Sequence, residues 1–140
     1  MIKLSKMTDY AVVILAEMAR GKGALMTASS LSAQTGLPEP TVSKVLKLLV
    51  KGDVIVSTRG VNGGYTLEKA PDSVTIAAVI TALDGPVALT ACVEGSEECC
   101  SLEHKCPLKG QWNPVNAAMK AALENVTLAQ MIAAVAGGVL

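Results

Sequence analysis

The segment Thr35-Gly36-Leu37-Pro38 constrains the fold more than any other part of the sequence, because it leaves only a short turn between two helical patterns. The first pattern starts at Thr27, a favourable N-cap residue, and ends at Gly36, a typical C-terminal stop. The second starts with two prolines that fit only the first turn of a helix, and its apolar stripe stops at Gly52. This pattern predicts a helix-turn-helix with residues 40–51 as its second helix, although many such helix pairs have no role in DNA binding.

The flanking segments extend this unit to a mainly α-helical fold with a small β-hairpin. Before it, Thr8 and Asp9 offer an N-cap and an acidic first turn, and apolar residues recur at helical spacing until Gly21. After it, residues 54–58 form a β-branched run, residues 59–64 are dense in turn formers, and a second strand follows. Three helices followed by a hairpin predict a winged helix-turn-helix.

In that arrangement the second helix of the pair enters the major groove of double-stranded DNA, and the hairpin reaches neighbouring phosphates or the minor groove. Lysines opposite the apolar stripe would contact phosphates, and hydroxyl groups beside them would contact base edges or phosphates. Glycines at the hairpin tip allow a close approach of the backbone. The candidate DNA-contacting residues are Lys3, Lys6, Thr41, Ser43, Lys44, Lys47, Arg59, Asn62 and Gly63.

The distribution of charge agrees with an anionic partner for the N-terminal half. The 140-residue chain has no formal net charge, yet residues 1–70 carry nine Lys and Arg against five Asp and Glu, and residues 71–140 carry three against seven. A basic half is also compatible with a solvated surface that has no partner. Aromatic residues make up only 2% of the chain, so the stacking platforms of single-strand binders are largely missing.

The C-terminal half contains a helix, a cysteine-bearing loop and two further helices. Thr75 caps a helical pattern over residues 76–83, and Asn113-Pro114 starts a later helix that the proline could kink. The apolar stripe of the later helix is either ordinary core or the seam of a homodimer. We favour the seam, because helix-turn-helix proteins commonly bind two half-sites as dimers. The stripe consists of Val115, Ala118, Met119, Ala122 and Leu123.

These patterns divide the chain into three parts. Residues 1–84 form the winged helix-turn-helix domain, residues 85–108 the cysteine-rich loop, and residues 109–140 a dimerisation helix and a last short helix that Thr127 caps. The apolar runs are too short to span a membrane, and the N-terminus lacks the apolar stretch of a signal peptide. We therefore expect a cytoplasmic protein with no membrane partner.

An enzymatic role is not indicated. The chain has one histidine, no phosphate-binding glycine motif and no nucleophile elbow. The glycines of residues 60–64 fit a hairpin tip better than a cofactor loop. We expect neither catalytic residues nor a small-molecule substrate.

All four cysteines, Cys92, Cys99, Cys100 and Cys106, lie within fifteen residues. In a reducing compartment such clustering indicates metal binding or redox chemistry more than structural disulfides. The gaps of six and five residues do not match the short spacing of zinc knuckles, whereas an iron–sulfur cluster tolerates wider spacing of its thiolate ligands. An iron–sulfur cluster, zinc, and reactive or unliganded thiols all stay open.

If one cysteine of the adjacent pair is spare, a fourth ligand must come from elsewhere in the chain. His104 lies inside the loop, and Asp9 precedes the first helix. Each has an ordinary alternative, as a solvated loop histidine and as an acid that the helix dipole stabilises.

The chain resembles the Rrf-two family of bacterial transcription regulators over nearly its whole length. The resemblance rests on T-D-Y-A near the N-terminus, L-x-x-G-x-V at the end of the second helix of the pair, and the hairpin string T-R-G-V-N-G-G-Y-x-L. Three spaced cysteines before a helix that begins near Trp112 complete it. The hairpin string is the most specific of these motifs, and the chain is most similar to the iron–sulfur cluster assembly regulators of the family.

The resemblance implies a homodimeric DNA-binding repressor that senses iron–sulfur cluster, iron or redox status and controls iron–sulfur assembly genes. In this interpretation Cys92, Cys99 or Cys100, and Cys106 hold a two-iron or four-iron cluster. The alternative is a winged-helix regulator whose cysteines bind zinc or act, without metal, as thiols that respond to redox state or nitric oxide.

Family members differ in the fourth cluster ligand. Some take it from the position that Asp9 holds here, in the partner subunit, and others use a histidine three residues after the last cysteine. That second position is Lys109, and His104 lies before Cys106 instead, so the resemblance favours Asp9.

Overall fold

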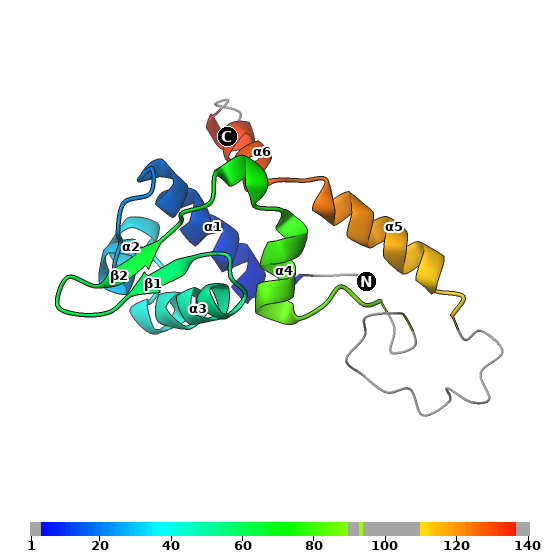
Figure 1. Cartoon of the computed structure of the whole chain (residues 1–140), viewed down its shortest axis with the longest axis horizontal. Coiled ribbons are helices and arrows are strands. Elements are labelled where there is room, and N and C mark those ends of the chain that lie inside the picture. Colours follow the sequence, from blue (N-terminus) through cyan, green and yellow to red (C-terminus); the bar gives the residue numbers. More distant parts are fainter. Residues whose placement is uncertain (1–3, 90–92, 94–109, 137–140) are drawn as a thin grey trace.

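The computed structural model describes residues 4–89, 93 and 110–136. Within these residues the chain is mainly helical, with one antiparallel hairpin, as the sequence predicts (Figure 1). In chain order the elements are α1 (Lys6–Arg20), α2 (Ala28–Thr35), α3 (Glu39–Lys51), β1 (Val56–Thr58), β2 (Gly64–Thr66), the 3-10 turn η1 (Pro71–Ser73), α4 (Ile76–Asp84), α5 (Asn113–Glu124) and α6 (Leu128–Ala136). None of the described helices has the length and apolar composition that a membrane span requires.

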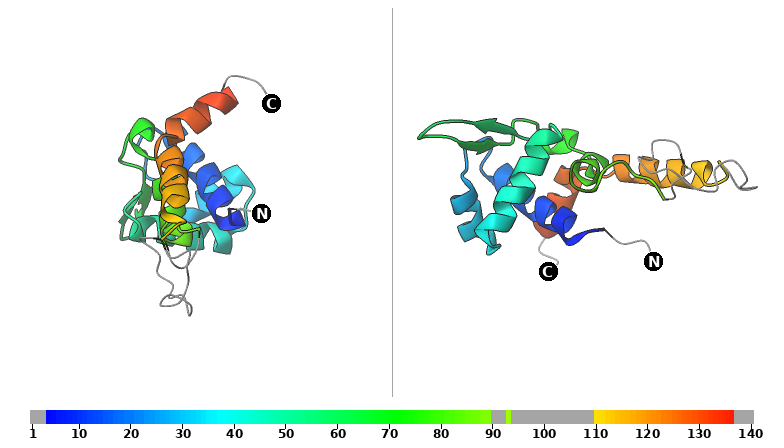
Figure 2. Two further views of the ribbon diagram at one scale, coloured as in Figure 1. Left: turned by 90° about the vertical axis from the view of Figure 1, so that its right-hand side faces the viewer. Right: turned by 90° about the horizontal axis from the view of Figure 1, so that it is seen from below.

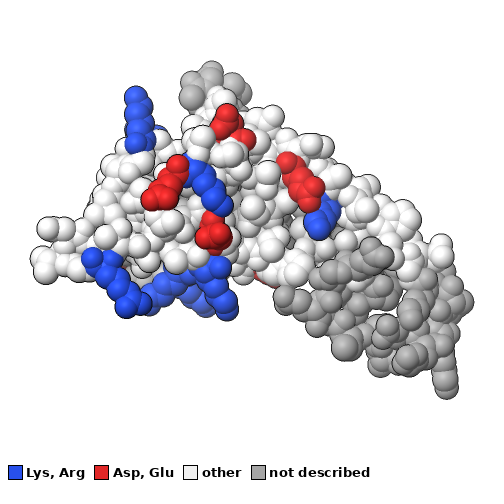
Figure 3. All heavy atoms as spheres, in the orientation of Figure 1, with Lys and Arg blue, Asp and Glu red and all other residues white. Residues whose placement is uncertain are grey.

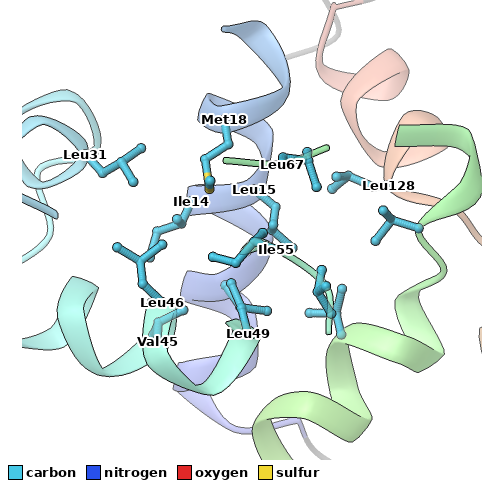
Figure 4. Close-up of a cluster of buried hydrophobic side chains, with 14 of the residues drawn as sticks. Ile14, Leu15, Met18, Leu31, Val45, Leu46, Leu49, Ile55, Leu67 and Leu128 are labelled. Carbon is cyan, nitrogen blue, oxygen red and sulfur yellow. The ribbon is translucent and has the colours of Figure 1, made fainter. Parts of the chain in front are cut away.

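The core of the N-terminal head, defined here as α1 to α4 with the hairpin, is aliphatic. Side chains from α1, α2 and α3 pack together with residues that follow α3 and with Leu67, the residue after β2 (Figure 4). The fully buried side chains include Ile14, Leu15, Met18, Leu31, Val42, Val45, Leu46, Leu49 and Ile55. Because all of α3's apolar stripe is buried, the opposite face of this helix is left to solvent.

The first helix starts earlier than the sequence predicts. Ser5, not Thr8, is the N-cap of α1, and the Ser5 hydroxyl accepts a hydrogen bond from the Thr8 backbone N–H at 3.2 Å. Thr8 is inside the first turn and is buried, and Asp9 also lies within that turn instead of preceding the helix. The prediction of an acidic first turn is confirmed, with the cap three residues earlier.

The turn between α2 and α3 is held by side-chain hydrogen bonds. Gly36 has a φ of 78°, a left-handed conformation that glycine adopts without strain, so the predicted helix stop is confirmed. The Thr35 hydroxyl donates to the Leu31 carbonyl at 2.7 Å, and the Ser32 hydroxyl donates to the Leu37 carbonyl at 2.6 Å. The first bond lies within α2, and the second ties α2 to Leu37 in the turn before the start of α3.

The hairpin pairs Val56 with Thr66 and Thr58 with Gly64, and it has a further contact that the sequence does not predict. Met26, just before α2, forms an antiparallel bridge with Tyr65, with backbone N···O distances of 2.9 and 2.7 Å. A Cβ on Gly64 would lie 2.7 Å from the Met26 carbonyl oxygen, so only glycine allows this approach. The hairpin is thereby anchored to the segment that precedes the helix-turn-helix.

The C-terminal helix α6 packs on the head. Thr75, which caps α4, forms an antiparallel bridge with Thr127, which precedes α6, so the first residues of the two helices lie close together. Leu128 is fully buried in the core of the head (Figure 4). The predicted cap at Thr127 is confirmed, because its hydroxyl accepts from the Gln130 backbone N–H at 3.2 Å. The predicted C-terminal part, residues 109–140, thus combines two helices that pack differently: α6 contacts η1 and α1, and α5 contacts α4.

Helix α5 projects from the head, as two further views show (Figure 2). It packs on α4, and Asn116 is its one residue classed as buried. Pro114 lies in the first turn, where a missing N–H costs nothing, so the expected kink is not found and the helix is continuous to Glu124.

Candidate DNA-binding surface and cysteine segment

The face of α3 opposite the core is basic. Lys44, Lys47 and Lys51 recur at three- and four-residue spacing on α3, and all three are exposed. Glu39 is the acidic residue of the same helix and lies in its first turn, where the helix dipole favours it. The structure therefore places the predicted lysines Lys44 and Lys47 together on one accessible face.

Thr41 and Ser43 occupy the N-terminal half of α3 and are half-buried. In a helix that enters the major groove, the N-terminal residues are those that approach the bases. The two hydroxyls lie in this N-terminal half of α3, and Lys47 and Lys51 lie farther along the same helix.

The five-residue turn of the hairpin carries the other predicted contacts. Arg59 and Asn62 are exposed, and Val61 at the same tip is fully exposed. Gly63 closes the turn, since its N–H donates to the Gly60 carbonyl at 2.9 Å and a Cβ at Gly63 would lie 2.3 Å from the Thr58 carbonyl oxygen. No side chain other than hydrogen fits at Gly63 without a shift of the backbone.

Basic side chains gather along one edge of the head. In the space-filling view they lie along the lower edge, where Figure 1 places α3 and the hairpin (Figure 3). Lys6 is exposed at the start of α1, and Lys3 lies outside the described residues. The described part of the predicted set thus supplies an accessible basic surface with hydroxyl groups beside it.

The predicted metal ligands fall almost entirely outside the described part of the chain. Cys92, Cys99, Cys100, Cys106 and His104 lie in the ranges 90–92 and 94–109, of which we describe no structure. Among residues 4–89, 93 and 110–136, no group of three or more His, Cys, Asp or Glu side chains could hold a metal ion. Asp9 is exposed on the first turn of α1, so its carboxylate is accessible to a ligand or to another chain.

Two polar contacts near the ends of the cysteine segment were not predicted from sequence. We define the cysteine segment as residues 90–109, between α4 and α5. Asp84, the last residue of α4, accepts hydrogen bonds from the hydroxyls of Ser5, the N-cap of α1, and Thr8 in its first turn. Asn116 on α5 binds the backbone of Val87 and Leu89. Both contacts join residues that are far apart in the sequence. A single sequence gives no signal for which distant polar residues pair.

The comparison with protein families agrees with this arrangement. Residues 4–134 match the Rrf2 family model, which is described as an iron-dependent transcriptional regulator and is the Rrf-two family of the sequence resemblance. An Rrf2-like HTH-type transcriptional regulator of Rhodobacter capsulatus is 30% identical over 139 residues, covering 94% of this chain and 93% of that protein. The HTH-type transcriptional regulator IscR of Erwinia tasmaniensis is 30% identical over 132 residues, covering 94% of this chain and 79% of that protein.

Solved structures show the same fold. The structure of CymR, the global cysteine regulator of B. subtilis, has a TM-score of 0.67 and 26% identity, and it covers 95% of this chain and 98% of its own. The structure of T. potens IscR has a TM-score of 0.66 and 23% identity, over 99% of this chain and 92% of its own, and it shows the fold alone. These relatives are transcriptional regulators and not enzymes.

Proposed function

Because the chain belongs to the Rrf2 family of transcriptional regulators, we propose that it is a homodimeric repressor that binds DNA and senses iron–sulfur cluster, iron or redox status through its cysteine segment. The observation that carries the proposal is that all four cysteines lie, in the sequence, between the head and the projecting helix α5. By similarity to the iron–sulfur assembly regulators, its target genes are those for iron–sulfur cluster assembly.

DNA recognition rests on α3 and the hairpin. Lys44 and Lys47 would neutralise phosphates and so supply affinity without sequence information. Thr41 and Ser43 would contact base edges, and Arg59, Asn62 and Gly63 would bring the hairpin against the neighbouring backbone or minor groove. Lys3 and Lys6, at the start of the chain, would add phosphate contacts.

The donor chemistry of the cysteine segment fits an iron–sulfur cluster. Four thiols in fifteen residues supply the thiolates that such clusters require, and Cys92, Cys99 or Cys100, and Cys106 would hold a two-iron or four-iron cluster. Asp9, or else His104, would be the fourth ligand, and the exposure of Asp9 supports a role as a ligand donated across the dimer. When bound, the cluster supplies a redox-active centre that constrains the segment and that oxidation or iron loss removes.

The exposed side of α5 supports a homodimer. One side of the helix exposes only small or apolar residues. The exposed Lys120 and Glu124 lie beside α4 instead, and Asn116 is buried. Of the predicted stripe, Val115, Ala118 and Ala122 are exposed, and Met119 and Leu123 are half-buried. A projecting helix with an uncharged exposed face is stable in water when a second copy covers it, and small side chains let two helices approach closely. The residues of this uncharged exposed side are Pro114, Val115, Ala117, Ala118, Ala121 and Ala122.

Ala118→Glu is expected to convert the dimer to a monomer, because the carboxylate would be desolvated in the seam. Analytical ultracentrifugation at micromolar concentration measures the change. Ala33→Glu, at an exposed alanine of α2, is the matched control and should leave the mass unchanged. A wild-type chain that sediments as a monomer, or an Ala118→Glu variant that stays dimeric, would reject α5 as the seam.

A thiol or zinc switch is the second candidate. The adjacent pair Cys99-Cys100 supports its thiol form, because two neighbouring sulfurs do not easily bind one small ion and one of them is then left as a thiol. In that case the protein would purify without colour, and oxidation or zinc loss would be the signal.

DNA binding itself is tested by selection from a pool of random duplexes with the wild-type protein. A homodimeric regulator should enrich a palindrome with half-sites about one helical turn, 10 base pairs, or a multiple of it apart. We call the enriched sequence the selected duplex. Enrichment of no sequence would contradict specific DNA recognition.

A further inference from the structure

A set of hydrogen bonds joins the C-terminal end of α4 to the start of α1. The Thr8 hydroxyl donates to Asp84 Oδ2 at 2.6 Å, and the Ser5 hydroxyl donates to Asp84 Oδ1 and Oδ2 at 2.8 and 3.0 Å. Thr8 is 1% exposed, and its hydroxyl has two partners, Asp84 and, at 3.3 Å, the Ser5 hydroxyl, of which Asp84 is the closer. A carboxylate at the N-terminal end of α1 is also favoured by the helix dipole. Asp84 is therefore an anchor for the first turn of α1.

A second set joins the chain that follows Asp84 to α5. The Asn116 side-chain oxygen accepts from the Leu89 N–H at 2.8 Å, and its amide nitrogen donates to the Val87 carbonyl at 3.1 Å. Asn116 is 5% exposed, and both ends of its amide are used. Val87 and Leu89 are thus held against α5 by a single side chain.

These two sets lie at the two ends of one short connection. Residues 84–89, which we call the strap, form the described chain that leads from the head to the cysteine segment. Pro86 has a fixed φ, and Asn116 restrains the residues after it, so the strap has few torsions that could absorb a displacement arriving at residue 90. A displacement would act on Asn116 at one end and on Asp84 at the other.

Through Asp84, the strap is bonded to the first turn of α1, which carries residues with roles in the proposed function. The first turn of α1 contains Lys6, a proposed phosphate contact, and Asp9, a proposed ligand. Farther along, Ile14 and Leu15 of α1 pack in the same core as the buried stripe of α3. A shift of α1 would therefore change the position of α3.

We propose that Asp84, through Ser5 and Thr8, is the positioning residue that transmits the state of the cysteine segment to α1 and so to the DNA-binding surface. This inference rests on the proposed function and adds the route by which the segment acts. A purely structural role would make the bonds stabilise the protein equally in every state of the cysteines. In a coupling role, the bonds are necessary for the difference in DNA affinity between the states of the cysteines.

The experiment compares wild type with Asp84→Asn and with Thr8→Val, which keeps the shape of the side chain and removes the hydroxyl. Each protein is prepared in three states: iron-free and reduced, reconstituted anaerobically with ferrous iron and sulfide, and oxidised with diamide. Two readouts are taken, the dissociation constant for the selected duplex and the hydrogen exchange of the backbone amides at the start of α1. Iron and sulfide contents are measured in each preparation.

We expect wild type to differ between states in both readouts. In Asp84→Asn and Thr8→Val, the dissociation constants for the selected duplex in the different states should agree within about twofold. Their iron and sulfide contents should equal those of wild type. Thr8→Ser, which restores the hydroxyl, and Asp72→Asn, an exposed acid on η1 with the same charge change, should keep the wild-type ratio.

Two outcomes overturn the inference and are distinguishable. If wild type responds to the cysteine state and Asp84→Asn and Thr8→Val respond equally, the strap is structural only and the proposed function stands. If wild type itself binds the selected duplex equally in all three states, the proposed sensing fails and the coupling fails with it. Should Thr8→Val not fold, Asp84→Asn and the hydrogen exchange of wild type decide between these outcomes.

Discussion

Replacing Lys44 and Lys47 together with glutamine is expected to weaken binding to the selected duplex by about 10- to 100-fold at physiological salt. Both side chains are exposed on the face of α3 opposite the core, so their loss removes phosphate contacts without disturbing the fold. The slope of log affinity against log salt concentration should fall by about two, since each phosphate contact contributes close to one unit. Fluorescence anisotropy across a series of salt concentrations measures both quantities.

The matched control is a double variant of two exposed lysines away from α3, Lys22→Gln with Lys120→Gln. It changes the net charge by the same amount and should leave the affinity and the salt slope close to wild type. Equal losses in the two double variants would mean that overall charge, and not the α3 surface, determines DNA binding.

Substitution of Cys92 or Cys106 by alanine is expected to abolish cluster binding, because neither has a neighbouring thiol that could replace it. Cys99→Ala and Cys100→Ala test the adjacent pair, and we expect only one of the two to lose the cluster. The measurement is iron and acid-labile sulfide per chain, with the visible absorbance spectrum, on protein reconstituted without oxygen. Ser101→Ala in the same segment is the control and should bind as wild type does.

The opposite result identifies the second candidate function. A wild-type protein that stays colourless after reconstitution and contains zinc, or no metal, would contradict the cluster. If zinc is present, the same cysteine variants then define its ligands.

Much of the head could be predicted from local sequence signals. The stop at Gly36, the cap at Thr27 and the apolar stripe of α3 each depend on residues within one or two turns, and all are confirmed. The hairpin followed from a β-branched run next to a cluster of turn formers. Local rules suffice where the determining contacts are local.

The cap of α1 shows where local rules fail. Thr8 has the chemistry of an N-cap, and so does Ser5. Both hydroxyls donate to Asp84, which lies 76 residues away from Thr8, and the Ser5 hydroxyl also accepts from the Thr8 backbone N–H. The bridge between Met26 and Tyr65 and the packing of Leu128 into the head are likewise contacts between distant parts of the chain. Periodicity and capping preferences carry no information about such pairs.

The candidate site is predictable to different degrees. Exposure of Lys44 and Lys47 follows from the helical period, because the buried stripe fixes which face is free. The cysteines are recognisable as a group, but thiol spacing alone does not select the metal or the fourth ligand. Asn116 could not be anticipated, since an asparagine in an alanine-rich helix gives no sign that it binds the backbone of Val87 and Leu89.

The most direct test of the central claim is the affinity of wild-type protein for the selected duplex in two preparations of one batch, reconstituted with iron and sulfide and then stripped of iron. The account predicts different dissociation constants, by about 5- to 150-fold, the usual range of coupling between two sites. Equal affinities, with iron and sulfide shown to be bound in one preparation and absent in the other, would contradict the claim that the cysteine segment controls DNA binding.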